Sequence, residues 1–400
     1  MILLHHVGTR RQSERQTHRP RRLRRRLVVA TLAAVVVGLS AGVVTGGASL
    51  AHATVAKGIS SPQLESEPAE STARAGMVRE IRRGLGAQWL RLGVSWAALQ
   101  PTRGEHSPTE LARLDALVGD LHAAGVKVIF TMHSMPSWAT DPYWWSHPPF
   151  DYPEGPQAFY PISGSCLKDY GALSEFLARR YKGRVHAMEC WNEPNVWFFL
   201  YPQRTADDPY YAARTYFRML KSFRAGVKRA GTGVRVVAGA TAPVGLNDRY
   251  RTSPQRFARF LRRAGASRHF DVYSHHPYTP GGSVYKAPDR PPNDPTRTVT
   301  LSNLRALLRL FPKKPFYLTE YGYNTRPNLM FGLKVNERTQ ARYLKAAFAQ
   351  ASRYRQVRLL VWYLLRDWRP ETGPANGGVY TGLRRLDGTR KPAWHAFRRL

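Results

Sequence analysis

Residues 185–195 read VHAMECWNEPN, an apolar-leaning run that closes on a glutamate between an asparagine and a proline. The run predicts a strand, and the residues after it favour a turn, because Asn and Pro are common turn residues. Glu193 therefore has two interpretations. It is either a solvated turn residue or a catalytic acid held at the mouth of a barrel, where a buried strand ends.

Short apolar runs of this kind alternate along the chain with stretches of helical periodicity. The helix that begins at Ser107 is the clearest, since Ser107 can cap it, Pro108 suits its first turn and Glu110 completes a capping box. Eight strands are expected, of which the first is weak: TVAKGIS (54–60), QWLRLGVSW (88–96), VKVIFTMH (126–133), VHAMECW (185–191), VRVVAGAT (234–241), FDVYSHHPY (270–278), KPFYLTEYG (314–322) and VRLLVWYLL (357–365).

Eight strand–helix units over some 350 residues predict one TIM (β/α)8 barrel, an α/β fold with a parallel sheet. No spacer divides the pattern, so residues 54–400 are expected to form a single catalytic domain. A doubly wound open sheet is the alternative. It would be expected to carry a glycine-rich phosphate turn after an early strand, and neither GxGxxG nor a P-loop is present.

Two glutamates stand at strand ends in this scheme. Glu193 closes the fourth strand and Glu320, in YLTEYG, closes the seventh. A TIM barrel gathers the C-terminal ends of its strands at one mouth, so residues far apart in sequence are expected to meet there. Cleavage of a glycosidic bond requires at least two carboxyl groups at one mouth, one protonated as the proton donor and one ionised as the nucleophile. Each motif alone is weak, and their joint placement favours catalysis.

With these motifs, the chain from about residue 55 to 400 resembles the clan A retaining glycoside hydrolases, and within them families 39 and 5. The resemblance implies that Glu193 is the acid/base, that Glu320 is the nucleophile and that no cofactor is needed. It also implies that an oligo- or polysaccharide is the substrate. Six further positions match substrate-binding residues of the clan: Arg91 in WLRLGVSW, His133 in FTMHS, Asn192, His276 and Tyr278 in HHPY, and Trp362 in LVWYLL.

Structural roles compete with these assignments. Arg91 could be a buried ion-pair partner, although an arginine within an apolar strand needs a nearby anion in either case. His133 and Trp362 could belong to the core. Adjacent strand residues point to opposite faces, so the sequence leaves open whether His275 or His276 faces the mouth. Trp138 and Trp197 lie in loops at the expected mouth, together with Trp144, Trp145 and Tyr323, where they could stack on sugars or pack the loops.

The chain is strongly basic, with a formal net charge of +34. Residues 1–26 hold nine Arg and one Glu, which leaves 52 − 26 = +26 on the rest. The charges are scattered, so they form either a solvated, Arg-rich surface or a surface for anionic cell-surface polymers, and no feature points to specific nucleic-acid binding. Two alternatives to catalysis follow: a barrel that binds glycan without cleaving it, and a basic surface protein that holds anionic polymers. Both carboxylates at the mouth argue against the first.

Cysteine and histidine do not occur with the spacing of a metal framework. Cys166 and Cys190 could pair or stay free, and no CxxC or Cys/His ligand spacing appears. The sequence therefore predicts no metal site.

The first 53 residues look like a targeting segment. RPRRLRRR (19–26) is followed by a long apolar run and by Ala51-His52-Ala53, the order of a secretory signal. The apolar run is long enough for an uncleaved membrane anchor within residues 27–50, with the basic side inside. Residues 54–400 are expected outside the cytoplasm, secreted in the first case and anchored in the second.

Overall fold

The computed structural model describes residues 54–147, 159–279, 286–327, 334–369 and 378–400. All of them belong to the second of the two units into which the chain divides, residues 1–50 and 51–400. The expected signal or anchor in residues 1–53 lies outside the described residues and stays a prediction. Among the described helices, none is both long and apolar enough to cross a bilayer.

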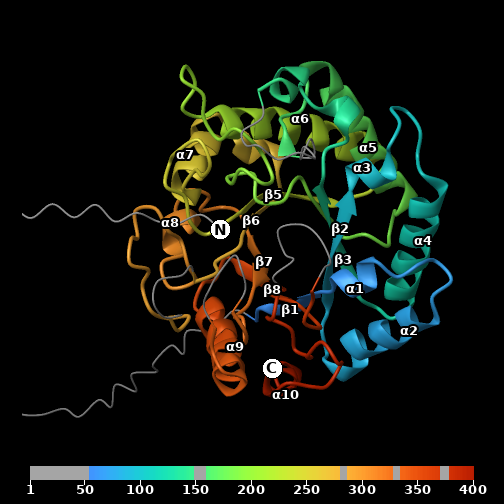
Figure 1. Cartoon of the computed structure of the whole chain (residues 1–400), viewed down its shortest axis with the longest axis vertical. Coiled ribbons are helices and arrows are strands. Elements are labelled where there is room, and N and C mark those ends of the chain that lie inside the picture. The colour runs from blue at the N-terminus through green and yellow to red at the C-terminus, as the bar shows by residue number, and fades with distance from the viewer. Residues whose placement is uncertain (1–53, 148–158, 280–285, 328–333, 370–377) are drawn as a thin grey trace, which may run out of the picture. The chain divides into compact units, whose positions relative to one another are not determined.

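Eight parallel strands close into a barrel in sequence order, and helices lie outside this ring (Figure 1). The prediction of a TIM barrel is confirmed, including the weak first strand. The strands are β1 (Ala56–Ser60), β2 (Trp89–Ser95), β3 (Lys127–His133), β4 (Ala187–Glu189), β5 (Arg235–Thr241), β6 (Val272–His275), β7 (Phe316–Tyr321) and β8 (Val357–Tyr363).

The helix over Pro108–Ala123 begins at the cap that its sequence predicts. Ser107 Oγ accepts a hydrogen bond from the backbone N–H of Glu110 at 3.3 Å, as the capping box predicts. The helices are α1 (Pro62–Glu65), α2 (Thr72–Arg79, continued by a π-helical turn over Glu80–Gly84), α3 (Trp96–Leu99), α4 (Pro108–Ala123), α5 (Leu167–Arg180), α6 (Tyr211–Ala230), α7 (Pro254–Arg263), α8 (Arg305–Leu308), α9 (Glu337–Ser352) and α10 (Pro392–Arg398).

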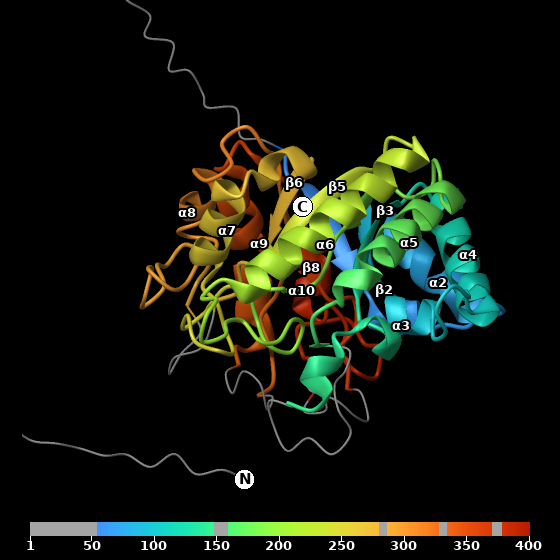
Figure 2. The ribbon, with the colours of Figure 1, turned by 90° about the horizontal axis from the view of Figure 1, so that it is seen from above.

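Helices α5 and α6 lie side by side against the barrel (Figure 2). Their close approach depends on glycine: a Cβ on Gly226 of α6 would lie 1.9 Å from the carbonyl oxygen of Gly171 in α5. Any larger residue at Gly226 would force the helices apart.

The barrel interior is layered. An apolar plug fills the half nearest the strand starts: Trp89, Ile129, Ala187, Val237, Val272, Tyr317, Leu359 and Val361. Side chains two residues further along three of these strands form a buried polar layer above it, Arg91, Thr131 and Glu189. Since every second residue of a strand faces the same way, this layer lies between the plug and the mouth.

Strand β4 ends at Glu189, four residues before Glu193, so Glu193 lies in the loop beyond the strand rather than at its last position. The loop still follows β5, because the backbone N–H of Cys190 donates to Val237 and that of Glu193 donates to Ala240, each at 3.0 Å. These two hydrogen bonds hold the loop against β5, although the loop is not part of a strand.

Candidate active site

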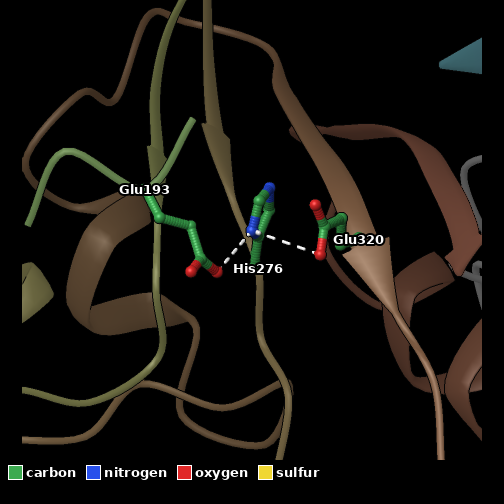
Figure 3. Close-up of side chains that lie close together, drawn as sticks. All are labelled: Glu193, His276 and Glu320. Carbon is green, nitrogen blue, oxygen red and sulfur yellow. Dashed lines mark hydrogen bonds and ion pairs between the residues drawn. The ribbon is translucent and has the colours of Figure 1, made fainter. Parts of the chain in front are cut away.

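Glu193 and Glu320 meet at the C-terminal ends of the strands, on either side of His276 (Figure 3). An oxygen of Glu193 and an oxygen of Glu320 lie within 4.8 Å of each other. Their side chains are 12% and 13% exposed, so both are mostly buried and still reach solvent. Two carboxyl groups this close resist simultaneous ionisation, which separates their proton affinities.

Glu320 is surrounded by donors. Arg91 Nη1 donates to its Oε1 at 2.6 Å, and the Tyr278 hydroxyl donates to its Oε2 at 3.0 Å. Burial raises the pKa of Glu320, while Arg91 and the Tyr278 hydrogen bond oppose that rise. A cation and a hydroxyl donor both favour the ionised carboxylate, the form that can act as a nucleophile.

Glu193 has different surroundings. Its backbone has a φ of +35°, a conformation that non-glycine residues adopt rarely and that the bond to Ala240 helps to hold. Its Oε1 lies 2.8 Å from Nδ1 of His276. Burial, followed by the nearby charge of Glu320, raises the pKa of Glu193 well above its usual range. These surroundings favour the protonated form at Glu193 more than at Glu320.

Arg91 connects the site to the polar layer beneath it. Its Nε and Nη2 donate to Glu189 Oε2 at 3.0 and 2.8 Å, and Nη2 also donates to Asn192 Oδ1 at 2.7 Å. Glu189 is fully buried and was missed by the sequence reasoning. An acid inside the apolar run VHAMEC was the available signal, because the arginine in β2 needed an anion. Arg91 holds both Glu320 and the amide next to Glu193.

His276, not His275, faces the mouth. His275 is turned away, where its ring nitrogens contact Thr241 and the carbonyl oxygen of Val299. Nε2 of His276 lies 3.1 Å from the Thr319 hydroxyl. Burial and then Arg91 lower the pKa of His276 well below its usual range, so this imidazole is neutral.

Another acid, Glu65, lies near His133. A Cβ on Gly93 would lie 2.9 Å from His133 Nε2 and 3.0 Å from Glu65 Oε2, so the missing side chain makes room for both groups. Burial raises the pKa of Glu65 to about 7, and burial together with Arg91 lowers that of His133 to about 4. Glu65 ends the single-turn helix α1 and carries no motif, so sequence reasoning missed it.

The structure does not bring Trp362 to the site. Leu359 and Val361 of β8 face the barrel interior, so Trp362 points outward, where it is fully buried and donates to the carbonyl oxygen of Thr381. The next residue, Tyr363, is half-buried and faces inward by alternation. Burial, followed by the charges of Glu320 and Glu65, raises the pKa of Tyr363.

The two loop tryptophans are held by packing. The Trp138 indole donates to the carbonyl oxygen of Gln100 and meets Trp96 edge to face. Trp197 packs edge to face against Phe159, and its backbone N–H donates to Tyr250. Both are partly exposed, and their role in sugar binding stays a prediction.

A cavity of about 1020 Å³ opens beside the Trp197 loop. Its lining includes the aromatic rings of Trp144, Tyr201, Tyr211 and Tyr250, which come from the loops after β3, β4 and β5 and from the first residue of α6. Tyr250 is also the backbone partner of Trp197, which lies four residues after Glu193. The cavity therefore adjoins the segment that carries Glu193.

Cys166 and Cys190 are both buried and free, so they do not form a disulfide. Glu193, His276 and Glu320 offer donor atoms within 4.8 Å of one another, close enough for a single cation. The hydrogen bond between His276 and Glu193 uses two of the same atoms. The absence of a metal site stays a prediction.

Residues 69–364 match the family described as cellulase (glycosyl hydrolase family 5), a range that includes both mouth carboxylates. The chain belongs to glycosyl hydrolase family 5. No protein of curated function matches this family 5 chain.

Solved structures share the fold of the family 5 chain at low identity. A family 39 glycoside hydrolase from Bacteroides cellulosilyticus is 21% identical with a TM-score of 0.60, covering 86% of this chain and 62% of its own. An exo-β-1,4-mannosidase from an Opitutaceae bacterium is 15% identical with a TM-score of 0.56, covering 86% and 58%. A GH5_18 protein from Streptomyces cattleya, in complex with Manβ1-4GlcNAc, is 16% identical with a TM-score of 0.60, covering 86% and 79%. The chain thus spans about three fifths of the first two.

Proposed function

We propose that the chain is a retaining O-glycoside hydrolase that cleaves an oligo- or polysaccharide by double displacement. The observation that carries this proposal is the spacing of at most 4.8 Å between oxygens of Glu193 and Glu320. Retaining glycosidases hold their two carboxyl groups about 5–5.5 Å apart, whereas inverting enzymes need about 6.5–9.5 Å to admit a water molecule. The short spacing supports direct attack by one carboxylate on the sugar.

The reaction assigns one role to each carboxyl group. Glu320 attacks the anomeric carbon while Glu193 gives its proton to the departing oxygen, so the glycosidic bond breaks as the bond to Glu320 forms. Glu193, now ionised, takes a proton from water, whose oxygen attacks the same carbon and releases Glu320. Arg91 and Tyr278 hold Glu320 ionised for the attack, and the amide of Asn192 is oriented by Arg91 toward the sugar.

The surroundings suggest how substrate lies in the mouth. The anomeric carbon must sit between Glu193 after β4 and Glu320 in β7, so the ring extends toward β1, β2 and β3. There Glu65 and His133 can hydrogen-bond to sugar hydroxyls over Gly93, with Tyr363 as an inward aromatic surface. The leaving group departs on the Glu193 side, where the aromatic cavity can receive further sugar units.

The test is a panel of aryl β-glycosides of glucose, mannose, galactose, xylose and uronic acids, with the first-formed anomer read by proton NMR. We expect at least one glycoside to release the β-anomer first. Release of the α-anomer would overturn the retaining mechanism. Wild-type protein that binds glycans but releases no reducing ends from any glycoside or polysaccharide would favour the binding barrel instead.

We further propose that the barrel acts outside the cytoplasm, on the basis of the expected signal or anchor in residues 1–53. Expression of the full chain and of residues 54–400 with fractionation tests this. Only the full chain should leave the cytoplasm, and retention in the membrane fraction would favour an anchor over a cleaved signal.

A further inference from the structure

A chain of hydrogen bonds runs from the buried polar layer to the acid at the mouth. Glu189 Oε1 lies 3.0 Å from the Thr319 hydroxyl, which lies 3.1 Å from Nε2 of His276. Nδ1 on the other side of the imidazole lies 2.8 Å from Glu193 Oε1 (Figure 3). Glu189, Thr319 and His276 are fully buried, so water does not substitute for these contacts.

The direction of the first bond follows from Glu189. Its Oε2 accepts two N–H groups of Arg91 and the hydroxyl of Thr131 at 2.8–3.0 Å. A carboxyl group bound to a guanidinium in this way is ionised and can only accept. The Thr319 hydroxyl has a single proton, which therefore points at Glu189.

The direction of the remaining bonds follows in turn. With its proton committed to Glu189, the Thr319 oxygen can only accept from His276, so Nε2 carries the ring proton. The imidazole is neutral, because burial and Arg91 lower its pKa, and it holds no second proton. Nδ1 then presents a lone pair, and its 2.8 Å contact with Glu193 requires a proton on Glu193.

We propose that Glu189 and Thr319 are positioning residues that lock His276 in its Nε2–H tautomer and thereby hold Glu193 in the protonated form that donates to the leaving group. This inference rests on the proposed glycosidase function for its catalytic meaning. After Glu193 has given up its proton, its carboxylate faces the lone pair of Nδ1. That unfavourable contact helps Glu193 to remove a proton from water in the second step.

Other charged and titratable groups around His276 are consistent with this assignment. Glu320 Oε2 lies 3.8 Å from Nδ1, too far for a hydrogen bond, and is already held by Arg91 and Tyr278. The Tyr278 ring meets the imidazole edge to face at 6.5 Å, and the adjacent His275 is bonded elsewhere. None of these contacts requires Nδ1 of His276 to carry a proton.

The tautomer can be measured without turnover. In protein labelled with 15N-histidine, the ring nitrogens of His276 are assigned by comparison with His276→Gln. We expect the shift of a bare Nδ1 and a protonated Nε2 in wild type. We expect Thr319→Val to move the proton toward Nδ1, because Nε2 loses its acceptor. A protonated Nδ1 in wild type would overturn the proposal whether or not the protein is a glycosidase.

The catalytic consequence is read on the glycoside that the panel identifies. Thr319→Val should move the alkaline limb of kcat/KM to lower pH by about one unit, because an Nδ1–H would favour the ionised acid. It should reduce kcat/KM by about 10- to 100-fold with a poor leaving group, which needs protonation, and only by about 3-fold with a dinitrophenyl leaving group.

Two variants control for a merely structural effect. Thr319→Ser keeps the hydroxyl and should restore the alkaline limb and the leaving-group dependence. Thr131→Val removes a different hydroxyl from Glu189 and should leave the alkaline limb in place. Equal losses on both leaving groups, or a serine variant that behaves like the valine variant, would overturn the role of Thr319.

Discussion

The two carboxyl groups of the mouth lie within 4.8 Å of each other and yet occupy opposite environments. Glu320 belongs to a strand and receives hydrogen bonds from a guanidinium and a phenol. Glu193 lies in a loop with a positive φ and contacts a neutral imidazole. The same residue type therefore serves as an anion on one side and as a proton donor on the other, because its neighbours differ.

The difference originates below the mouth. Arg91 stabilises the charge of Glu320 directly, and through Glu189 and Thr319 it orders the imidazole beside Glu193. One buried cation thus favours ionisation of Glu320 and, through this hydrogen-bond chain, orients the imidazole beside Glu193. Changes at either carboxyl group, and at Arg91, should separate these two effects.

The largest effect is expected from removing the carboxyl groups themselves. Glu320→Ala should lower kcat by on the order of 10⁵-fold with every leaving group, because no nucleophile remains. Glu193→Ala should retain the first step with a dinitrophenyl leaving group, which departs without a proton. Azide should then rescue Glu193→Ala to a glycosyl azide of retained configuration and Glu320→Ala to one of inverted configuration.

Product configuration by NMR distinguishes the two variants. If Glu320→Ala kept wild-type rates on an activated aryl glycoside, or if azide gave the same anomer with both variants, the assignment of roles would be wrong. Glu337→Ala, at the start of α9 and outside the mouth, serves as the matched glutamate control.

A smaller effect on rate, joined by an effect on stability, is expected at Arg91. Arg91→Ala leaves the buried Glu189 without its cation and should lower the free energy of unfolding by about 3–5 kcal/mol. Arg91→Lys should recover part of that stability but lose about 10²- to 10³-fold in kcat, because one ammonium cannot bridge Glu189, Glu320 and Asn192.

Urea unfolding and kcat are measured on the same preparations. A lysine variant with wild-type kcat would show that a positive charge alone suffices at this position and that the several N–H donors of the Arg91 guanidinium are dispensable.

Much of the fold could be predicted because its signals are local and repeated. Apolar runs marked all eight strands, and the cap at Ser107 marked the start of α4 within one residue. Glu193, Glu320, Arg91, Asn192 and the HHPY segment were expected to meet, and the structure brings them together. Because the strands are parallel and follow the order of the sequence, the positions of the strand ends alone predict that these residues converge at one mouth.

The parts that escaped depend on register and on tertiary contacts. Trp362 and Tyr363 are adjacent aromatics in a buried strand, and nothing in VRLLVWYLL tells which of them faces inward. Glu65 lies on one helical turn, held by Ser61 at its cap and by Arg113 at its carbonyl oxygen. Neither contact leaves a periodic pattern in the sequence.

The smallest of these effects is expected at Tyr278, which, of the two carboxyl groups, hydrogen-bonds to Glu320. Its hydroxyl donates to Glu320 and so helps to keep the pKa of that carboxyl group down against burial. Tyr278→Phe should raise the pKa of Glu320, and because the nucleophile must be ionised, the acidic limb of kcat/KM should move to higher pH. The loss at the optimum should be about 10- to 100-fold. The alkaline limb, which reports Glu193, should move less, so a pH profile in which only that limb shifts would assign Tyr278 to the acid instead of the nucleophile.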